Sequence, residues 1–228
     1  MADTKVTVTI ARNGPYLVKG GASLSRFNIG ADAAGNSEEW VEGEKIQTQA
    51  NYALCRCGQS ATKPFCDGTH AKKGFDGTEI ADRAPYVEQA DAIDGPDVTM
   101  SDAEKLCAFA RFCDPNGKVW NQVEKSDDPK IREMLIRQVN ACPSGRLVAW
   151  DKKTGTAIEH RLPVSIGLIE DPVEKCAGPI WLRGGIALIG ADGFEYEEHN
   201  RMTLCRCGAS KNKPFCDGSH ASIHFTDK

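Results

Sequence analysis

The sequence lacks any long apolar segment. No stretch approaches the roughly 18 consecutive apolar residues that a membrane-spanning helix requires. The first residues, MADTKVTVTIARNG, also lack the apolar segment of a secretory signal peptide. We therefore expect a soluble cytoplasmic protein with no membrane partner.

An excess of basic residues is also missing. The 28 lysines and arginines are outnumbered by 32 aspartates and glutamates, which gives a formal net charge of -4. Nucleic-acid binding depends on basic patches that neutralise phosphates, so we expect no nucleic-acid partner. No glycine-rich nucleotide fingerprint occurs in a strand-turn-helix context, which argues against a bound flavin or nicotinamide.

Cysteine, by contrast, is abundant and clustered. Six of the ten cysteines lie in two segments, CRCGQSATKPFCDGTH from Cys55 to His70 and CRCGASKNKPFCDGSH from Cys205 to His220, which match at 12 of 16 positions. In a reducing compartment, clustered cysteines that are followed by histidine indicate metal binding rather than disulfides.

The spacing within each segment groups the candidate ligands in pairs. Cys55 and Cys57 follow an extended stretch, and residues two apart on an extended chain project to the same face. Cys66 and His70 are four apart, so a helical turn that opens at Asp67 or Gly68 would place both on one side. The Asp67 carboxylate can cap the exposed amides of that turn. One pair for each metal atom suggests two metal atoms in each segment.

The ligand types leave more than one metal open. Three thiolates and one histidine suit either a tetrahedral zinc ion or an iron-sulfur cluster. Structural zinc sites usually combine pairs with a C-x2-4-C spacing, so the one-residue gap of C-x-C disfavours zinc. A third alternative, that these cysteines are merely buried, would require the same spacing to recur twice by chance.

Both segments fit the pattern C-x-C-x2-[ST]-x3-P-x-C-D-G-[STA]-H, and the chain thereby resembles the CDGSH iron-sulfur family, the mitoNEET-like proteins. The resemblance implies two [2Fe-2S] clusters per chain, each held by three cysteines and one histidine. It also implies an internal pseudo-dimer, because family members with one motif form dimers that exchange strands in a β-cap. The implied metal and cofactor ligands are Cys55, Cys57, Cys66 and His70 for one cluster and Cys205, Cys207, Cys216 and His220 for the other.

The repeat extends beyond the cysteines, since GPYLVKGG at 14–21 is similar to GPIWLRGG at 178–185. Both copies read as short strands, at 16–18, 52–54, 180–182, 186–189 and 202–204. The first copy is longer, and the stretch 29–45 is expected to be a loop. We predict an α+β fold with two β-rich CDGSH units, 1–80 and 172–228, around a helical insert at 98–150.

Two helices are expected in the insert, after an acidic linker at 76–97. Ser101 and Glu104 form a capping box, which predicts a helix from Asp102 to about Arg111. A second helix should begin after Asp128 as N-cap and end near residue 140. Its apolar face is formed by Ile131, Met134, Leu135 and Val139.

Four further cysteines lie between the two motifs. The segment with Cys107, Cys113 and Cys142, followed by Pro143, resembles a divergent single-cluster ferredoxin domain. It differs at Phe109, where relatives have histidine. These cysteines and Cys176 are therefore either ligands of a further cluster or small buried apolar residues.

The charged residues inside the motifs also have two interpretations. Arg56, Arg206, Lys63 and Lys213 are either solvated surface charges or neighbours of an anionic cluster that favour its reduced form. A histidine ligand in place of a thiolate removes one negative charge and should raise the reduction potential.

The leading functional hypothesis is a non-enzymatic iron-sulfur protein. It would pass single electrons to a redox partner or transfer its cluster to an acceptor protein, and the two motif copies would allow it to be a monomer. One alternative is an electron-transfer component of an oxidoreductase complex. The other is a zinc-stabilised interaction module.

Overall fold

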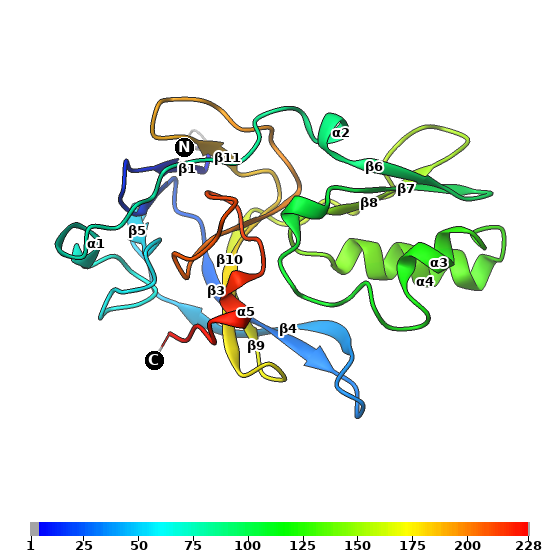
Figure 1. Cartoon of the computed structure of the whole chain (residues 1–228), viewed down its shortest axis with the longest axis horizontal. Helices are drawn as coiled ribbons and strands as arrows, with labels where there is room; N and C mark the ends of the chain where they lie inside the picture. Colours follow the sequence, from blue (N-terminus) through cyan, green and yellow to red (C-terminus); the bar gives the residue numbers. More distant parts are fainter. Residues whose placement is uncertain (1–4, 228) are drawn as a thin grey trace.

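The computed structural model describes residues 5–227, which form three β-sheets and a few short helices (Figure 1). The strands are β1 Thr7–Ile10, β2 Tyr16–Lys19, β3 Leu24–Ala31, β4 Ser37–Ile46, β5 Tyr52–Leu54, β6 Asp91–Asp94, β7 Val98–Asp102, β8 Leu147–Asp151, β9 Ser165–Asp171, β10 Cys176–Arg183, β11 Ala187–Ile189 and β12 Arg201–Leu204. The helices are α1 Thr69–Lys72, α2 Tyr86–Gln89, α3 Val119–Val123, α4 Pro129–Ala141 and α5 Ser219–Ser222, with the 3-10 helix η1 at Glu104–Leu106.

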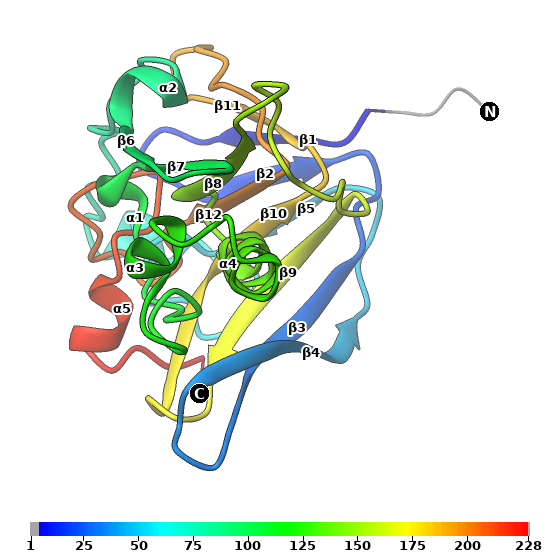
Figure 2. The same ribbon diagram turned by 90° about the vertical axis from the view of Figure 1, so that its right-hand side faces the viewer.

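The two motif copies exchange a strand with each other. In the first copy β1, β2 and β5 are antiparallel neighbours, and β11 of the second copy joins them parallel to β1. In the second copy β9, β10 and β12 are antiparallel neighbours, and β3 of the first copy joins them parallel to β9. The predicted internal pseudo-dimer and the α+β fold class are confirmed by this reciprocal arrangement, in which the two sheets lie close together (Figure 2).

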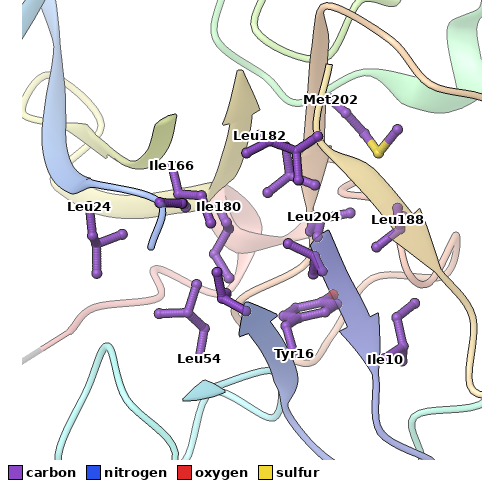
Figure 3. Close-up of a cluster of buried hydrophobic side chains, with 14 of the residues drawn as sticks. Ile10, Tyr16, Leu24, Leu54, Ile166, Ile180, Leu182, Leu188, Met202 and Leu204 are labelled. Atoms are coloured by element: carbon purple, nitrogen blue, oxygen red, sulfur yellow. The ribbon is translucent and has the colours of Figure 1, made fainter. Parts of the chain in front are cut away.

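The two sheets share one apolar core. Tyr16, Leu24 and Leu54 of the first copy pack with Ile166 and Ile180 of the second, and each of these side chains is almost fully buried (Figure 3). Burial of a side chain of this size contributes roughly 1.5–3 kcal/mol to folding. Because the core draws on both copies, neither copy can bury its apolar face alone.

The extra residues of the first copy form a strand, so the loop predicted at 29–45 is wrong. β3 continues to Ala31, and β4 pairs with it from Ser37 to Ile46 as the edge of the second sheet. Its glutamates are exposed, as is usual for an edge strand that faces solvent. Trp40 turns inward, where the centre of its ring system lies 4.8 Å from those of Phe112 and Trp181.

The middle of the chain forms an antiparallel sheet, β6-β7-β8, against which α3 and α4 pack. The second predicted helix is confirmed as α4. Its N-cap Asp128 accepts hydrogen bonds from the amides of Lys130 at 2.8 Å and Ile131 at 3.3 Å. Leu135 and Val139 are fully buried on its inner face.

The helix predicted from Asp102 to Arg111 is wrong. Residues up to Asp102 belong to β7, which pairs with β8, and only η1 follows. The Ser101 hydroxyl caps no helix, because it is hydrogen-bonded to the Tyr86 hydroxyl at 2.9 Å and to Trp150 Nε1 at 2.8 Å. The expected linker at 76–97 is irregular only in part, since it contains α2 and β6.

The boundaries of the three predicted units, 1–80, 98–150 and 172–228, stay predictions. Within residues 5–227, no helix has both the length and the apolar character needed to cross a bilayer.

Candidate metal centres

Each motif is held in shape by its own backbone. Cys55 follows β5 directly, and its amide donates to the Pro64 carbonyl at 2.8 Å, while the Cys66 amide donates to the Ala53 carbonyl at 2.9 Å. The chain therefore doubles back and brings Cys66 next to the first cysteine pair. The Ser60 hydroxyl closes the intervening loop by donating to the Phe65 carbonyl at 2.7 Å, and Ser210 does the same at Phe215.

A single helical turn then positions the histidine. The Asp67 carboxylate accepts hydrogen bonds from the amides of Ala61 at 2.8 Å and Thr69 at 2.9 Å. The second copy repeats this turn as α5, with Asp217 in the same role. The predicted helical turn after Asp67 is thus confirmed in both copies.

The eight candidate ligands lie in four close pairs. The Sγ atoms of Cys55 and Cys57 are 3.7 Å apart, and Cys66 Sγ lies 3.3 Å from Nδ1 of His70. In the second copy the corresponding pairs are Cys205 with Cys207 at 3.8 Å and Cys216 with Nδ1 of His220 at 3.4 Å.

These distances suit one metal atom for each pair. Two sulfur ligands at about 2.3 Å from a tetrahedral metal atom are separated by about 3.8 Å. Between residues 5 and 227, no three histidine, cysteine, aspartate or glutamate side chains converge as ligands of a single metal ion. The four close pairs therefore suit two metal atoms in each copy better than a single ion held by all four ligands.

The buried thiols must lose protons to bind metal, whereas the buried imidazole of His220 is already uncharged. Burial raises the pKa of the Cys57, Cys66 and Cys216 thiols. Burial also lowers the pKa of His220 to about 4, and nearby Arg206 acts in the same direction. A neutral imidazole can offer Nδ1 to a metal atom, whereas each thiol must release a proton to do so.

The two thiols of the second inner pair affect each other's pKa. A hydrogen bond from the Cys207 thiol lowers the pKa of Cys205 to about 7, and the same contact together with burial raises the pKa of Cys207. One thiolate is thus available in this pair before the other.

The two motifs touch each other at their second cysteines. A Cβ atom placed on Gly58 would lie 2.3 Å from the Cys207 carbonyl oxygen, and one on Gly208 would lie 2.5 Å from that of Cys57. Tyr16 connects the copies further, since its hydroxyl donates to the Cys205 carbonyl at 2.9 Å. No sequence pattern pointed to this contact between the sites.

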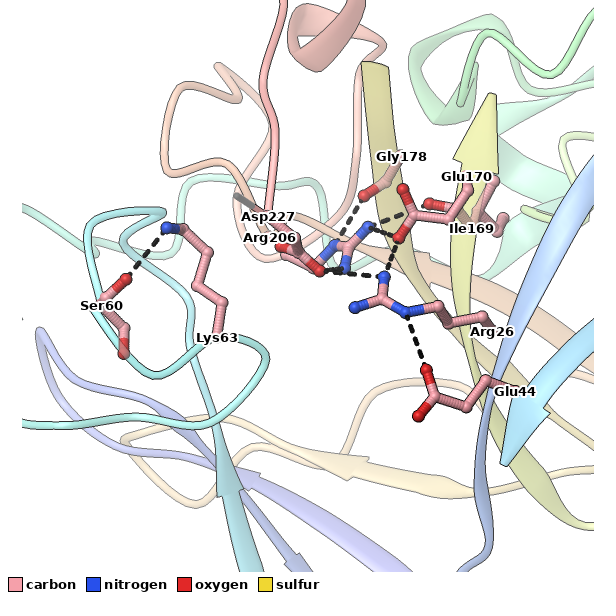
Figure 4. A network of polar contacts seen from close by, with 9 residues as sticks. All are labelled: Arg26, Glu44, Ser60, Lys63, Ile169, Glu170, Gly178, Arg206 and Asp227. Atoms are coloured by element: carbon pink, nitrogen blue, oxygen red, sulfur yellow. Dashed lines mark hydrogen bonds and ion pairs between the residues drawn. The ribbon is translucent and has the colours of Figure 1, made fainter. Parts of the chain in front are cut away.

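The motif arginines are buried, so the interpretation of Arg56 and Arg206 as solvated charges is wrong. Arg206 donates to the carbonyls of Gly178 and Ile169 and pairs with the carboxylates of Glu170 and Asp227 (Figure 4). Glu170 lies far from the motif in sequence and Asp227 lies seven residues after it, and sequence reasoning missed both partners.

Arg56 has a different environment. Its Nη1 donates to the Ala11 carbonyl at 3.3 Å, and its guanidinium lies 5.6 Å from the ring centres of Tyr16 and Phe75. Nε and Nη2 have no hydrogen-bond partner in the part of the chain that the structure describes. A Cβ atom on Gly77 would lie 2.5 Å from Nη2, so the backbone itself approaches the guanidinium.

The motif lysines hold the loops. Lys63 Nζ donates to the Ser60 carbonyl at 2.9 Å (Figure 4). In the second copy Lys213 Nζ donates to the Ser210 carbonyl at 2.6 Å. The effect of these charges on a bound cluster stays a prediction.

Three of the remaining cysteines lie in one region. Burial raises the pKa of Cys113 to about 12, and the neighbouring Cys142 and Cys107 thiols act in the same direction. Cys176 lies apart on β10, beside Asp171 and Glu174. Three thiols are one fewer than a four-cysteine cluster requires, so the middle segment does not supply a complete set of that kind.

Comparison with known families agrees with the geometry. The family described as iron-binding zinc finger CDGSH type matches residues 13–71 and 177–221, and the family described as divergent 4Fe-4S mono-cluster matches residues 93–152. Searches of curated proteins and of solved structures gave no significant match. The chain is thus an iron-sulfur protein that contains two CDGSH iron-binding domains on either side of a divergent mono-cluster segment.

Proposed function

We propose that the chain binds two [2Fe-2S] clusters and acts in electron transfer or cluster transfer, with no catalytic step of its own. Cys55, Cys57, Cys66 and His70 hold the first cluster. The second is held by Cys205, Cys207, Cys216 and His220. The observation that carries this proposal is the recurrence, in both copies, of a sulfur pair at 3.7–3.8 Å and a sulfur-imidazole pair at 3.3–3.4 Å.

A bound [2Fe-2S] cluster supplies reversible one-electron chemistry. The protein contributes the environment. The amides of Gly68 and Gly218 each lie 3.4 Å from the adjacent cysteine sulfur and donate to it, which stabilises a thiolate there. Because His70 and His220 each replace a thiolate, each site has one negative charge fewer than a site with four thiolates. The lower negative charge favours acceptance of an electron.

The partners that suit this function are a redox protein or a protein that accepts a cluster. All ten cysteines are free thiols, which suits the reducing cytoplasm. The two copies already complete each other's sheets, so a monomer is the proposed oligomeric state.

Metal analysis of protein purified without air tests the proposal. We expect about four irons and a similar amount of inorganic sulfide per chain, with visible absorbance. A chain with alanine at Cys55 and Cys205 is the matched control and should lose both iron and sulfide. Zinc without sulfide would instead support the alternative of a zinc-stabilised interaction module. A stable complex with an oxidoreductase on affinity capture would support the alternative of an electron-transfer component of an enzyme complex.

A further inference from the structure

The two sites differ in how deeply their sulfur-imidazole pairs are buried. In the second copy Cys216 is 3% exposed and His220 is 4% exposed. In the first copy both Cys66 and His70 are partly exposed. The motifs themselves are nearly identical, so the difference must come from what lies around them.

Two elements account for the difference: β10, which packs against α5, and the loop at 107–111, which follows η1 and leads to Cys113. A Cβ atom placed on Gly218 would lie 3.3 Å from the Cβ of Phe109 and 3.5 Å from the Cys107 carbonyl oxygen. Asn212 Nδ2 also donates to the Lys105 carbonyl at 2.8 Å. The loop therefore lies directly on the motif that carries Cys216 and His220.

An ion pair fixes this loop in place. Arg111 Nη1 and Nη2 donate to the two Asp171 carboxylate oxygens at 2.6 Å and 3.1 Å, and the Asp171 side chain is almost fully buried. A bidentate arginine-carboxylate pair with a buried partner has a defined geometry. Nη1 of Arg111 also donates to the Phe109 carbonyl at 3.2 Å, and its guanidinium lies 5.3 Å from the Phe109 ring.

The backbone of the loop is held in an unfavourable conformation. Phe109 has φ 56° and Arg111 has φ 61°, in the left-handed region that bulky residues seldom adopt. Such conformations persist only where the surrounding contacts impose them. Here the ion pair of Arg111 with Asp171 and the packing of Phe109 on Gly218 are the contacts that hold the two residues in this conformation.

Within residues 5–227 the first site has no such cover. A Cβ atom on Gly68, the equivalent of Gly218, would meet no heavy atom of these residues within 4 Å. In Figure 1, α1 lies at the edge of the molecule away from the middle segment, whereas α5 lies next to it.

We propose that the loop at 107–111 shields the second site from solvent and from other molecules. The chain then exchanges metal with partners at the first site and retains it at the second. This inference rests on the proposed function. It assigns the mono-cluster segment a protective role toward the neighbouring CDGSH site, whether or not that segment binds metal itself.

Removal of iron under anaerobic conditions tests the proposal. The chelator bipyridyl removes the iron, and the loss of visible absorbance measures the rate. The unmodified chain should lose its absorbance in two phases of similar amplitude. Their rates should differ by about tenfold or more, which corresponds to about 1.4 kcal/mol. The C66A variant should retain only the slow phase, and the C216A variant only the fast phase.

Two variants should weaken the cover of the loop at 107–111 over the second site in different ways. R111Q removes the ion pair to Asp171, and F109A removes the ring without a change of charge. Each should accelerate the slow phase several-fold and leave the fast phase unchanged. R132Q is the matched control, because Arg132 pairs with Asp151 at 3.3 Å on α4 and β8.

A single rate in the unmodified chain would overturn the inference. So would a slow phase that neither R111Q nor F109A accelerates, with circular dichroism verifying that both variants are folded. The proposed function fails separately, since a preparation without inorganic sulfide would contradict it before any decay is measured.

Discussion

The guanidinium of Arg206 forms a buried ion pair with the carboxylate of Asp227, the seventh residue after the second motif's histidine. The seventh residue after the first motif's histidine is Gly77, and within residues 5–227 Arg56 forms no ion pair of this kind, although the Asp76 carboxylate lies in its vicinity. Two otherwise similar sites thus have different charges beside them. The Arg56 guanidinium, which lacks a buried carboxylate in direct contact, should give the first site the higher reduction potential.

Replacement of Asp227 by asparagine should raise the potential of the second site toward that of the first. The substitution removes a negative charge from beside Arg206, and an added electron is then stabilised more by the guanidinium. A potentiometric titration monitored by visible absorbance measures the effect. D192N is the control, because Asp192 pairs with Arg83 on the surface at 2.8 Å; an identical titration curve for D227N and D192N would contradict the argument.

Replacement of a histidine ligand by cysteine should lower the potential of that site alone. The change adds one negative thiolate to the ligand set, and the expected decrease is on the order of 100 mV. H70C and H220C should shift different halves of the titration curve. H160A serves as control, because His160 lies outside both motifs; a shift of both halves in either single variant would not fit two separate sites.

Substitution of Gly58 by alanine should destabilise the fold. The new methyl group would have to occupy space 2.3 Å from the Cys207 carbonyl oxygen, at a φ of 73°. Gly155 has a similar φ of 69° but no heavy atom within 4 Å of a Cβ, so G155A isolates the cost of the backbone conformation. Urea unfolding should show that G58A lowers the free energy of unfolding by at least about 1 kcal/mol more than G155A. Equal losses would mean that the contact between the motifs is loose.

His199 should make stability depend on pH. Burial lowers its pKa, although Glu197 and Glu159 act in the opposite direction. Because the folded chain then binds fewer protons than the unfolded chain, the contribution of His199 is present above a pH of about 6.5 and is lost on acidification. In H199Q the free energy of unfolding should fall less between about pH 7 and pH 5 than in the unmodified chain. Equal losses in both chains would exclude this role.

The sequence was most informative where chemistry and spacing act locally. The gap of two between Cys55 and Cys57 and the gap of four between Cys66 and His70 predicted the pairs that the structure contains. The duplicated segment, through its resemblance to the CDGSH family, likewise predicted the pseudo-dimer that the shared sheets contain.

Contacts between distant segments could not be predicted in the same way. The sequence at Ser101 predicted a helix cap, but the residues there pair with β8 as part of β7. The glutamate-rich stretch of β4 predicted a loop, but it pairs with β3 as an edge strand. The carboxylate of Asp227 beside Arg206 and the loop that covers Gly218 follow no motif. The structural consequences of these differences between the two sites are visible only in the folded arrangement.

Pulsed electron paramagnetic resonance of the reduced protein, labelled with nitrogen-15 in histidine alone, tests the central claim most directly. We expect about two unpaired spins per chain, both coupled to a histidine nitrogen. The coupling should disappear from one half of the signal in H70C and from the other half in H220C. Spins without any histidine coupling, or a protein with no reducible signal at all, would contradict the assignment of a thiolate-imidazole pair to each site.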